Sequence, residues 1–376
     1  MKIALLSDCY PPRLGGIETQ VRDLGRALHA AGHEVAVFTA TRGEHSGRGL
    51  RNVEVSDEQG VAVHRVTLPL PFDLPVNPLA PRLIREELRG FDVAHVHMGV
   101  ISPFAVDLGD LALELDVPTA VTWHCVLGDA GIRLRRGLGT TRRWAERGAA
   151  LSAVSGMAAG LVAETVGPDV PIAVLPNGIH PDPWRPPQPG EAGGEAVMVT
   201  SALRFASRKR VPALVRMLQQ VYDAHPARVR ARVFGDGPLL GAVRRLTARN
   251  ADWLALPGRV ARADLAGAYA QGGIYLAPTR MEAFGIAALE ARTAGLPVVA
   301  MRSSGVADFI TDGVEGLLAD DDASLVAATR RLVADDELRE RIRAHNLAAP
   351  PEQVWDTVLQ RALAEYSRAG AAGAAG

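Results

Sequence analysis

Two glutamates flank a glycine turn in the second half of the chain. Glu282 and Glu290 stand eight residues apart in the segment MEAFGIAALEA, where a strand at 274–277 meets a turn at Gly285 and a helix follows. If both lay on one helix, about 12 Å of helix axis would separate them. A glycosidase needs its two carboxylates within about 5–10 Å of each other, so that chemistry is not indicated. The spacing favours two contacts along one extended ligand. An ordinary surface helix would explain the two glutamates but not the glycine.

Two predicted helix starts have the features of anion sites. The backbone N–H groups of Phe284, Gly285 and Ile286 are expected at or near a helix N-terminus, where unsatisfied donors suit a phosphate or sugar hydroxyls. Gly15 and Gly16 open another helix directly after the first strand, and glycine lets a ligand approach the backbone closely. A plain tight turn explains the second pair equally well, and both interpretations stay open.

A basic cluster follows the first strand of the second half, expected at 196–201. Arg204, Arg208, Lys209 and Arg210 fall within seven residues. Arginine and lysine both match the negative charge of a diphosphate. The alternative is a solvated charged loop. Because the cluster lies at the carboxyl end of a strand, where α/β folds bind ligands, anion binding is favoured.

Histidines follow two strands of the first half. His124 ends the strand at 119–123, and a side chain at that end of a strand is expected to face a ligand cleft. Its imidazole can donate a hydrogen bond, although a lone histidine is often only structural. His95 and His97 occupy an earlier strand end, and without an evident third metal ligand they are interpreted as structural.

No metal centre is predicted. The two cysteines, Cys9 and Cys125, have no CxxC spacing, which excludes a disulfide scaffold and a cysteine zinc site and fits a reducing cytoplasm. The acidic run at 320–322 precedes a helix and is interpreted as a helix cap that also complements the helix dipole.

The elements that must position these residues alternate between strands and helices. Short Val/Ile/Ala-rich runs separated by helical patterns predict βαβ units and parallel sheets covered on both faces. In the first half the strands are expected at 2–7, 33–38, 61–66, 93–96, 119–123 and 150–154, and in the second at 196–201, 229–234, 253–255, 273–277 and 297–301. The fold class is therefore α/β, with two doubly wound halves and an active site expected in the cleft between them.

The domain boundaries follow from a segment dense in proline and glycine at 176–196. We predict an N-terminal domain at 1–177 and a C-terminal domain at 178–349. An amphipathic helix at 350–367 and an Ala/Gly-rich flexible tail at 368–376 complete the chain.

Composition excludes several classes of protein. Hydrophobic residues make up 48% of the 376 and charged residues 22%, so the chain is not mainly disordered. A net charge of −1, from 41 basic and 42 acidic residues, argues against a nucleic-acid partner. No uninterrupted apolar run approaches the roughly 18 residues of a membrane-spanning helix, and the short run at 3–6 is no signal peptide.

The ordered motifs resemble the family 4 retaining glycosyltransferases of GT-B fold, whose signature is E-x7-E. The resemblance spans the whole chain. The matching features, in order, are Gly15-Gly16, His124, Pro176-Asn177-Gly178, Arg204 with Lys209, Gly235-Asp236-Gly237-Pro238, Gly258-Arg259-Val260 and Glu282 with Glu290. It implies transfer of a hexosyl group from a nucleotide-diphosphate sugar, such as UDP-GlcNAc or GDP-mannose, with retention and without a metal or other cofactor.

The same resemblance assigns roles in the second half. Arg204 and Lys209 would bind the diphosphate, and Glu290 would bind the ribose. Glu282 and the backbone of 284–286 would bind the transferred sugar. Preorganised cations stabilise the charge that develops on a leaving diphosphate, which is where rate enhancement arises.

In the first half, the resemblance places the donor phosphate beside Gly15 and Gly16 and the sugar beside His124. The leaving phosphate oxygen would help to deprotonate the acceptor, and the final helix would return to the N-terminal domain. Two positions depart from the family pattern. His180 stands where the family usually has aspartate, and Arg210 follows Lys209 where glycine is usual.

The first half is also similar to phosphatidylinositol N-acetylglucosaminyltransferases and mannosyltransferases, which implies a lipid-linked acceptor, although relatives with small glycoside acceptors share this region. Residues 131–147 carry six arginines interleaved with Leu134, Leu138 and Trp144. Such a segment can dock on an anionic membrane, and a solvated helix face is the alternative. The expected location is therefore the cytoplasm, with peripheral contact at the inner membrane face.

Three other functions share parts of this pattern. A sugar-nucleotide epimerase of the same fold would act without an added acceptor, and a non-catalytic protein would bind nucleotide sugars without turnover. A nicotinamide dehydrogenase is disfavoured, because neither half has a complete GxGxxG followed by an acidic residue about 20 positions on.

Overall fold

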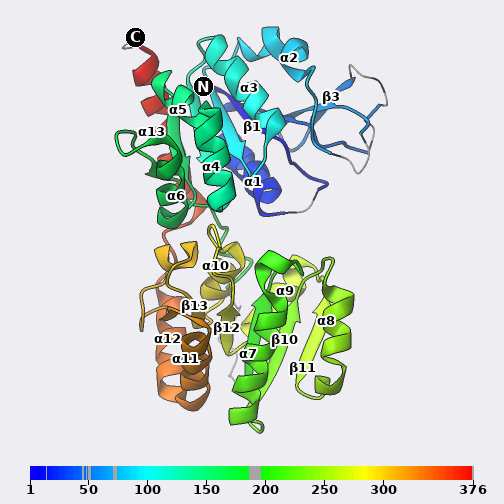
Figure 1. Cartoon of the computed structure of the whole chain (residues 1–376), viewed down its shortest axis with the longest axis vertical. Coiled ribbons are helices and arrows are strands. Elements are labelled where there is room, and N and C mark those ends of the chain that lie inside the picture. Colours follow the sequence, from blue (N-terminus) through cyan, green and yellow to red (C-terminus); the bar gives the residue numbers. More distant parts are fainter. Residues whose placement is uncertain are drawn as a thin grey trace. The chain divides into compact units, whose positions relative to one another are not determined.

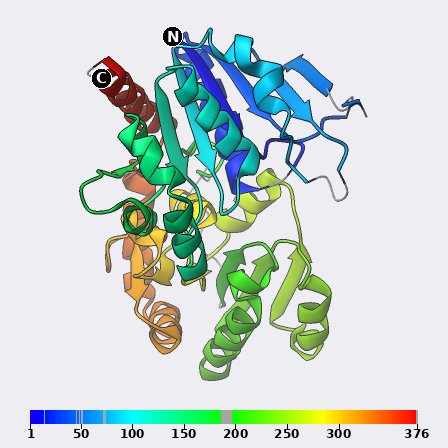
Figure 2. The same cartoon turned by 45° about the horizontal axis from the view of Figure 1, so that its top comes forward.

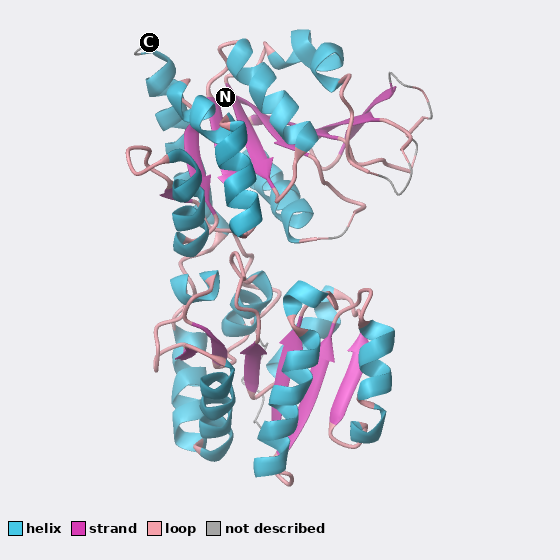
Figure 3. Ribbon diagram, in the orientation of Figure 1, coloured by secondary structure: helices cyan, strands magenta, loops and turns pink. Residues whose placement is uncertain are grey.

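The computed structural model describes residues 1–13, 15–44, 46–47, 49, 52–70, 74–185 and 196–374. The chain divides into two compact units, which Figure 1 shows: Met1–Gly178 together with Trp355–Gly376, and Ile179–Val354. Each unit is a mainly parallel sheet with helices on both faces (Figure 3). The prediction of two doubly wound α/β halves is confirmed.

The N-terminal unit contains an eight-stranded sheet in the order β3-β4-β2-β1-β5-β6-β7-β8. Only the β3–β4 pair is antiparallel among the described strands. The strands are β1 (Lys2–Ser7), β2 (Glu34–Thr39), β3 (Asn52–Asp57), β4 (Ala62–Thr67), β5 (Val93–Met98), β6 (Thr119–Trp123), β7 (Ala150–Ala153) and β8 (Ala173–Val174).

Central strands are apolar because helices cover both faces of this sheet. Alternate residues of β1 enter different cores: Ala4 and Leu6 pack with α3, whereas Ile3 and Leu5 pack with α1 and the last helix. The helices of this unit are α1 (Gly16–Ala30), α2 (Ala80–Leu88), α3 (Pro103–Glu114), α4 (Asp129–Leu138), α5 (Thr140–Glu146), α6 (Gly156–Val166) and α13 (Trp355–Ala374).

The last helix is longer than predicted. The flexible tail expected at 368–376 is wrong for residues 368–374, which continue α13 in the N-terminal unit (red in Figure 2). Ala369 is buried and the Arg368 guanidinium donates to the Leu151 carbonyl at 2.7 Å. Alanine is the strongest helix former, so once these contacts anchor the last turns the Ala-rich end stays helical.

The C-terminal unit contains a six-stranded parallel sheet in the order β11-β10-β9-β12-β13-β14. Its strands are β9 (Val197–Ala202), β10 (Val229–Phe234), β11 (Leu254–Gly258), β12 (Ile274–Ala277), β13 (Val298–Met301) and β14 (Gly316–Ala319). Its helices are η2 (Ser207–Lys209), α7 (Val211–Ala224), α8 (Leu240–Leu246), η3 (Ala248–Asn250), α9 (Arg262–Ala270), α10 (Ile286–Thr293), η4 (Gly305–Asp308), α11 (Asp322–Ala334) and α12 (Asp336–Ala348). Because β9 and β12 are neighbours, the loops after them lie at the same end of the sheet.

The predicted linker at 176–196 begins as a fixed segment. Gln20 of α1 holds Gly178 from both sides, donating to its carbonyl at 3.0 Å and accepting from its N–H at 2.9 Å. Ile179 then pairs with Val354. The units therefore divide after Gly178 and again after Val354, whereas the sequence placed the end of the second domain at 349. Residues 186–195 lie outside the described residues.

Candidate functional site

An ion pair joins the basic cluster to the first glutamate of the E-x7-E segment. Lys209 ends η2 after β9, and Glu282 lies in the loop after β12. The Lys209 Nζ lies 2.5 Å from Glu282 Oε2, and each side chain keeps about a fifth of its surface exposed, 20% and 21%. The structure thus brings together two residues that are 73 positions apart in sequence.

The Gly-x-Gly loop after β10 supports the strand end that carries Arg204. A Cβ on Gly235 would lie only 1.9 Å from the Leu203 carbonyl oxygen, and Phe205 N–H donates to the Asp236 carbonyl at 2.8 Å. These glycines therefore allow two backbones to pack closely. Arg204 itself is exposed and forms no ion pair with any part of the chain that the structure describes.

Arg210 departs from the family's glycine, and its conformation explains the family preference. Its φ of +59° is in the left-handed region, which glycine adopts readily. Its guanidinium is bound by protein partners: it donates to the Pro278 carbonyl at 2.8 Å and pairs with Asp322 at 2.6 Å. Arg210 therefore supports the loops and is not an available diphosphate ligand.

The turn at 284–286 is built as the sequence predicts. Gly285 has a φ of +89°, and a Cβ there would lie 2.5 Å from Val306 Cγ2. Phe284 is buried against Phe309, with ring centroids 5.4 Å apart. Ile286 begins α10, so the first N–H groups of this helix have no intrahelical acceptor.

Glu290 lies within α10, four residues after Ile286, and is largely buried, with 12% of its side chain exposed. Its Oε1 lies 3.4 Å from an Arg262 nitrogen. Burial raises the pKa of Glu290 to about 7, against the opposing effect of Arg262. The carboxylate is therefore held partly desolvated beside the Arg262 guanidinium.

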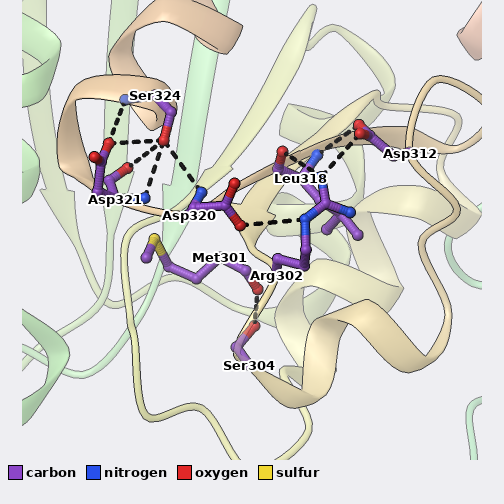
Figure 4. Close-up of polar contacts among 8 residues, drawn as sticks. All are labelled: Met301, Arg302, Ser304, Asp312, Leu318, Asp320, Asp321 and Ser324. Carbon is purple, nitrogen blue, oxygen red and sulfur yellow. Dashed lines mark hydrogen bonds and ion pairs between the residues drawn. The ribbon is translucent and has the colours of Figure 1, made fainter.

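Each carboxylate of the acidic run at 320–322 has its own protein partner. Asp321 caps α11 by accepting from the Ser324 N–H at 2.7 Å, which confirms the predicted cap (Figure 4). Asp320 accepts from Arg302 at 3.2 Å, in the network that Figure 4 draws around that guanidinium. Asp322 pairs with Arg210 and Arg280.

The glycine pair after β1 has two different surroundings. A Cβ on Gly15 would lie 2.2 Å from Oε2 of Glu18, whose buried carboxylate folds back over the start of α1. A side chain at Gly15 would therefore have to displace the Glu18 carboxylate. A Cβ on Gly16 would meet nothing within 4 Å, so Gly16 is the position open to an approaching ligand.

His124 is fixed by neighbours of its own unit. Its Nε2 lies 3.0 Å from His97 Nδ1. Burial lowers the pKa of His124 to about 4, although its contact with the Asn177 side chain favours the protonated ring. His124 is therefore neutral at pH 7 and can act as a hydrogen-bond partner but not as a cation.

The contacts of His95 agree with the structural role predicted for it. Its Nδ1 lies 3.0 Å from the Tyr366 hydroxyl of α13 and its Nε2 lies 2.7 Å from the Thr122 hydroxyl. Fully buried, it helps to attach the final helix to the sheet. His97 is also buried, but its Nε2 has no hydrogen-bond partner within the described ranges. His97 and His124 are among the residues that line a small cavity of about 20 Å³. A space of that size holds about one water molecule.

Two family profiles match the chain in sequence. The profile described as "Glycosyltransferase Family 4" matches residues 14–183, and the one described as "Glycosyl transferases group 1" matches residues 195–335. The chain is therefore a glycosyltransferase with a family 4 domain in its first half and a group 1 domain in its second. The predicted family and enzyme class are thereby confirmed.

Relatives of this glycosyltransferase align along nearly its whole length. The D-inositol 3-phosphate glycosyltransferase of Xylanimonas cellulosilytica is 29% identical, covering 94% of this chain and 92% of the relative. The phosphatidyl-myo-inositol mannosyltransferase of Mycobacterium leprae is 27% identical, covering 96% and 94%. Anabaena HepE, solved with UDP and glucose, superposes with a TM-score of 0.73 at 16% identity, covering 98% and 99%, and shares the GT-B fold.

The sequence missed two residues of this glycosyltransferase that bear on the site. Arg262, which contacts Glu290, has no motif around it. Asp8 follows β1, and its Oδ1 accepts from the Phe104 N–H at the start of α3 at 3.0 Å. Burial raises the pKa of Asp8 to about 6. An acidic residue directly after a buried strand was the available signal for Asp8.

Proposed function

We propose that this glycosyltransferase transfers a hexosyl group, with retention, from a UDP-sugar or GDP-mannose to an acceptor that carries inositol, either lipid-linked or as a small glycoside. The two relatives named above act on inositol phosphate and phosphatidylinositol, which supports that acceptor class. The GT-B neighbour with bound UDP supports a nucleotide-diphosphate donor.

The observation that carries the proposal is the Lys209–Glu282 pair between the loops after β9 and β12. Lys209 offers a positive charge, the exposed Arg204 offers a second, and the start of α10 offers free N–H groups. Breaking a sugar–phosphate bond places negative charge on the diphosphate, which such fixed groups stabilise more in the transition state than in the ground state.

Within this proposal, Glu282 binds hydroxyls of the transferred sugar and Glu290 binds the ribose. Gly16, with Gly15, lets the donor phosphate approach, and the neutral imidazole of His124 binds the sugar by hydrogen bonding. The leaving phosphate oxygen accepts the acceptor's proton, so the proposal requires no further base and no metal ion or other cofactor.

A donor panel tests the proposal directly. Thermal unfolding is measured with UDP-, GDP- and ADP-sugars, and a donor at 100 times its dissociation constant should add about 2.7 kcal/mol of stability. The stabilising donor is then incubated with phosphatidylinositol or inositol phosphate, with Glu282→Gln as the inactive control. Product in which the sugar keeps its anomeric configuration is expected, at the same rate with EDTA.

Each alternative has its own outcome in this experiment. Conversion of the donor sugar without an acceptor would identify an epimerase. Stabilisation by a donor without turnover of any acceptor would identify a binding protein. Loss of activity in EDTA that magnesium restores would overturn the metal-independent mechanism.

We also propose peripheral binding to an anionic membrane through one surface of the N-terminal unit. Val100, Ile101, Leu134 and Leu138 expose 46%, 79%, 57% and 59% of their surface. Arg135 of α4 donates to the Val100 carbonyl at 3.0 Å and so holds the 99–101 loop against the helix that carries both leucines. None of the helices in the described ranges has the length and apolar character needed to cross a bilayer.

Several arginines of this surface are held by protein partners and so are less free to face a membrane than the sequence suggests. Arg136 donates to the Glu164 carbonyl, Arg142 pairs with Asp169, and Arg143 donates to the Leu138 carbonyl. Arg133 and Arg147 remain exposed, and among described residues they have no ion pair. At about 1 kcal/mol per basic residue near an anionic surface, the apolar side chains must supply much of the affinity.

Sedimentation with vesicles tests the membrane proposal. The protein should sediment with anionic phosphatidylserine vesicles at low salt, and the Ile101→Ser/Leu134→Ser double variant should remain in the supernatant. Leu246→Ser is the matched control, because Leu246 is a 61% exposed leucine of the other unit. Failure of the unaltered protein to sediment would overturn this proposal and leave the donor chemistry untouched.

A further inference from the structure

Arg262 lies between the ribose-binding candidate and an aromatic ring. It is the first residue of α9, and it follows the loop after β11. One nitrogen of its guanidinium lies 3.4 Å from Glu290 Oε1, and its central carbon lies 5.0 Å from the centroid of the Trp184 ring. The guanidinium thus contacts two separate segments of the C-terminal unit.

The ring beneath Arg262 is rigidly packed. Trp184 is 1% exposed and lies 5.8 Å from the Tyr269 ring, which in turn meets the Tyr275 ring edge-on at 5.8 Å. Stacking on an aromatic face orients an arginine's planar donors, even where the arginine is partly exposed. Arg262, although 40% exposed, is therefore restricted in orientation.

Glu290 keeps one oxygen available. Oε1 faces Arg262, whereas Oε2 accepts no hydrogen bond from the residues that the structure describes. The charged or titratable groups that face this carboxylate are Arg262 and Tyr269 of α9 and Tyr275 of β12. Burial raises the pKa of both tyrosines, so they are neutral. Arg262 is the cation that opposes the effect of burial on the pKa of Glu290.

We propose that Arg262, stacked on Trp184, is a positioning residue for donor binding: it holds Oε1 of Glu290 and so turns Oε2 toward the ribose hydroxyls. This inference rests on the proposed function, because it takes Glu290 as the ribose ligand. It adds a residue outside the E-x7-E segment. Without Arg262, the buried Glu290 takes up a proton at higher pH, and a protonated acid is a poorer acceptor for two hydroxyls.

The test is nucleotide affinity as a function of pH. Binding of UDP and of GDP is measured by calorimetry from pH 6 to pH 8.5 for the unaltered protein and for Arg262→Gln, Arg262→Lys and Glu290→Gln. Arg245→Gln removes an equal charge from the exposed face of α8 and serves as the control. Thermal unfolding of each variant verifies that it is folded.

Arg262→Gln should bind about tenfold more weakly at pH 7, as expected for loss of a charged hydrogen bond. Because Glu290 then ionises at higher pH, most of that loss should disappear by pH 8.5. Arg262→Lys should keep the normal pH profile, since it retains the charge, and recover only part of the affinity. Glu290→Gln should bind weakly at every pH, and Arg245→Gln should bind normally.

The opposing outcomes are separable. An Arg262→Gln protein with normal affinity and a normal pH profile would overturn the role of Arg262 and leave the donor site intact. Normal affinity in Glu290→Gln would instead overturn the ribose assignment. If the unaltered protein bound neither nucleotide, this inference and the donor proposal would both fail.

Discussion

The guanidinium of Arg210 pairs with the carboxylate of Asp322 across the C-terminal unit, with Nη2 2.6 Å from Oδ2. Arg210 precedes α7, and Asp322 begins α11. A second hydrogen bond, to the Pro278 carbonyl, brings in the loop after β12. One side chain therefore fixes the spacing of three segments around the Lys209–Glu282 pair, and it does so from a left-handed backbone that favours glycine.

Replacement of Arg210 should separate its side-chain contacts from its backbone cost. Arg210→Ala and Arg210→Gly both lose the two contacts, but alanine also keeps the left-handed cost of about 1–2 kcal/mol. Glycine avoids this cost, but its larger unfolded-state entropy offsets part of the gain. We therefore expect the free energy of unfolding of the glycine variant to exceed that of the alanine variant by about 0.5–1 kcal/mol. Scanning calorimetry should give melting temperatures in the order wild type, glycine, alanine. A glycine variant that melts below the alanine variant would contradict this account.

Gly285→Ala should destabilise the C-terminal unit and weaken donor binding. The new Cβ would lie 2.5 Å from Val306 Cγ2 on a backbone with a φ of +89°, so α10 must shift. We expect a loss of about 2–3 kcal/mol from strain and overpacking together. Gly267→Ala is the control, because a Cβ in that helical position meets nothing within 4 Å and should be neutral or slightly stabilising. Equal melting temperatures for the two variants would refute the expectation.

The sequence predicted the central strands because their apolar runs are buried on both faces. It missed β3, β8 and β14. The edge strand β3 alternates half-exposed and exposed residues and carries little apolar signal. β8 has only two residues, and β14 has four that include Gly316. Short or one-sided strands depend on tertiary pairing, which a local pattern does not encode.

The sequence predicted the parts of the site in which a motif fixes the backbone. It predicted less well the side chains whose partners are distant in sequence. Gly285 was found because a turn into a helix requires it, and its φ of +89° agrees. Arg210 was grouped with Lys209 because both are basic neighbours, yet the left-handed turn sends it toward Asp322. Arg262 approaches Glu290 from 28 residues away, a separation that no spacing rule singles out.

Removing Lys209 and removing Arg204 should have different effects on the kinetics of the enzyme. Lys209→Ala should lower kcat by about 10²–10³-fold, as for the loss of one transition-state donor, and should also free Glu282. Arg204→Ala should lower kcat/KM without changing the melting temperature, because Arg204 is exposed and has no ion pair among the described residues. Steady-state kinetics measure both, with Arg208→Ala as the neighbouring exposed control. Normal kcat in Lys209→Ala would contradict the assignment of the diphosphate site.

The histidines of the N-terminal unit should make the protein less stable as the pH falls. Burial lowers the pKa of His95 to about 3 and of His124 to about 4, and lowers the pKa of His97 well below its usual value. These groups stay neutral in the folded protein but bind protons in the unfolded chain below about pH 6.5. The stability of the folded protein is therefore unaffected by these groups above about pH 6.5. Below that pH, each group lowers the free energy of unfolding by up to about 1.4 kcal/mol per pH unit.

Asp8 acts in the opposite direction over part of the same range. Burial raises its pKa to about 6 from 3.8, so between those values the folded protein holds a proton that the unfolded chain does not. Its contribution to stability is complete below pH 3.8 and is lost as the pH rises through 6.

Replacing Asp8 by asparagine removes this compensation, because asparagine does not titrate. In Asp8→Asn the side-chain Oδ1 can still accept from the Phe104 N–H. We therefore expect the melting temperature to fall from pH 7 to pH 5 in the unaltered protein and to fall more steeply in Asp8→Asn. Asp129→Asn, at an exposed position of the same unit, should follow the unaltered protein. A slope in Asp8→Asn no steeper than that of the unaltered protein would show that Asp8 is not the compensating group.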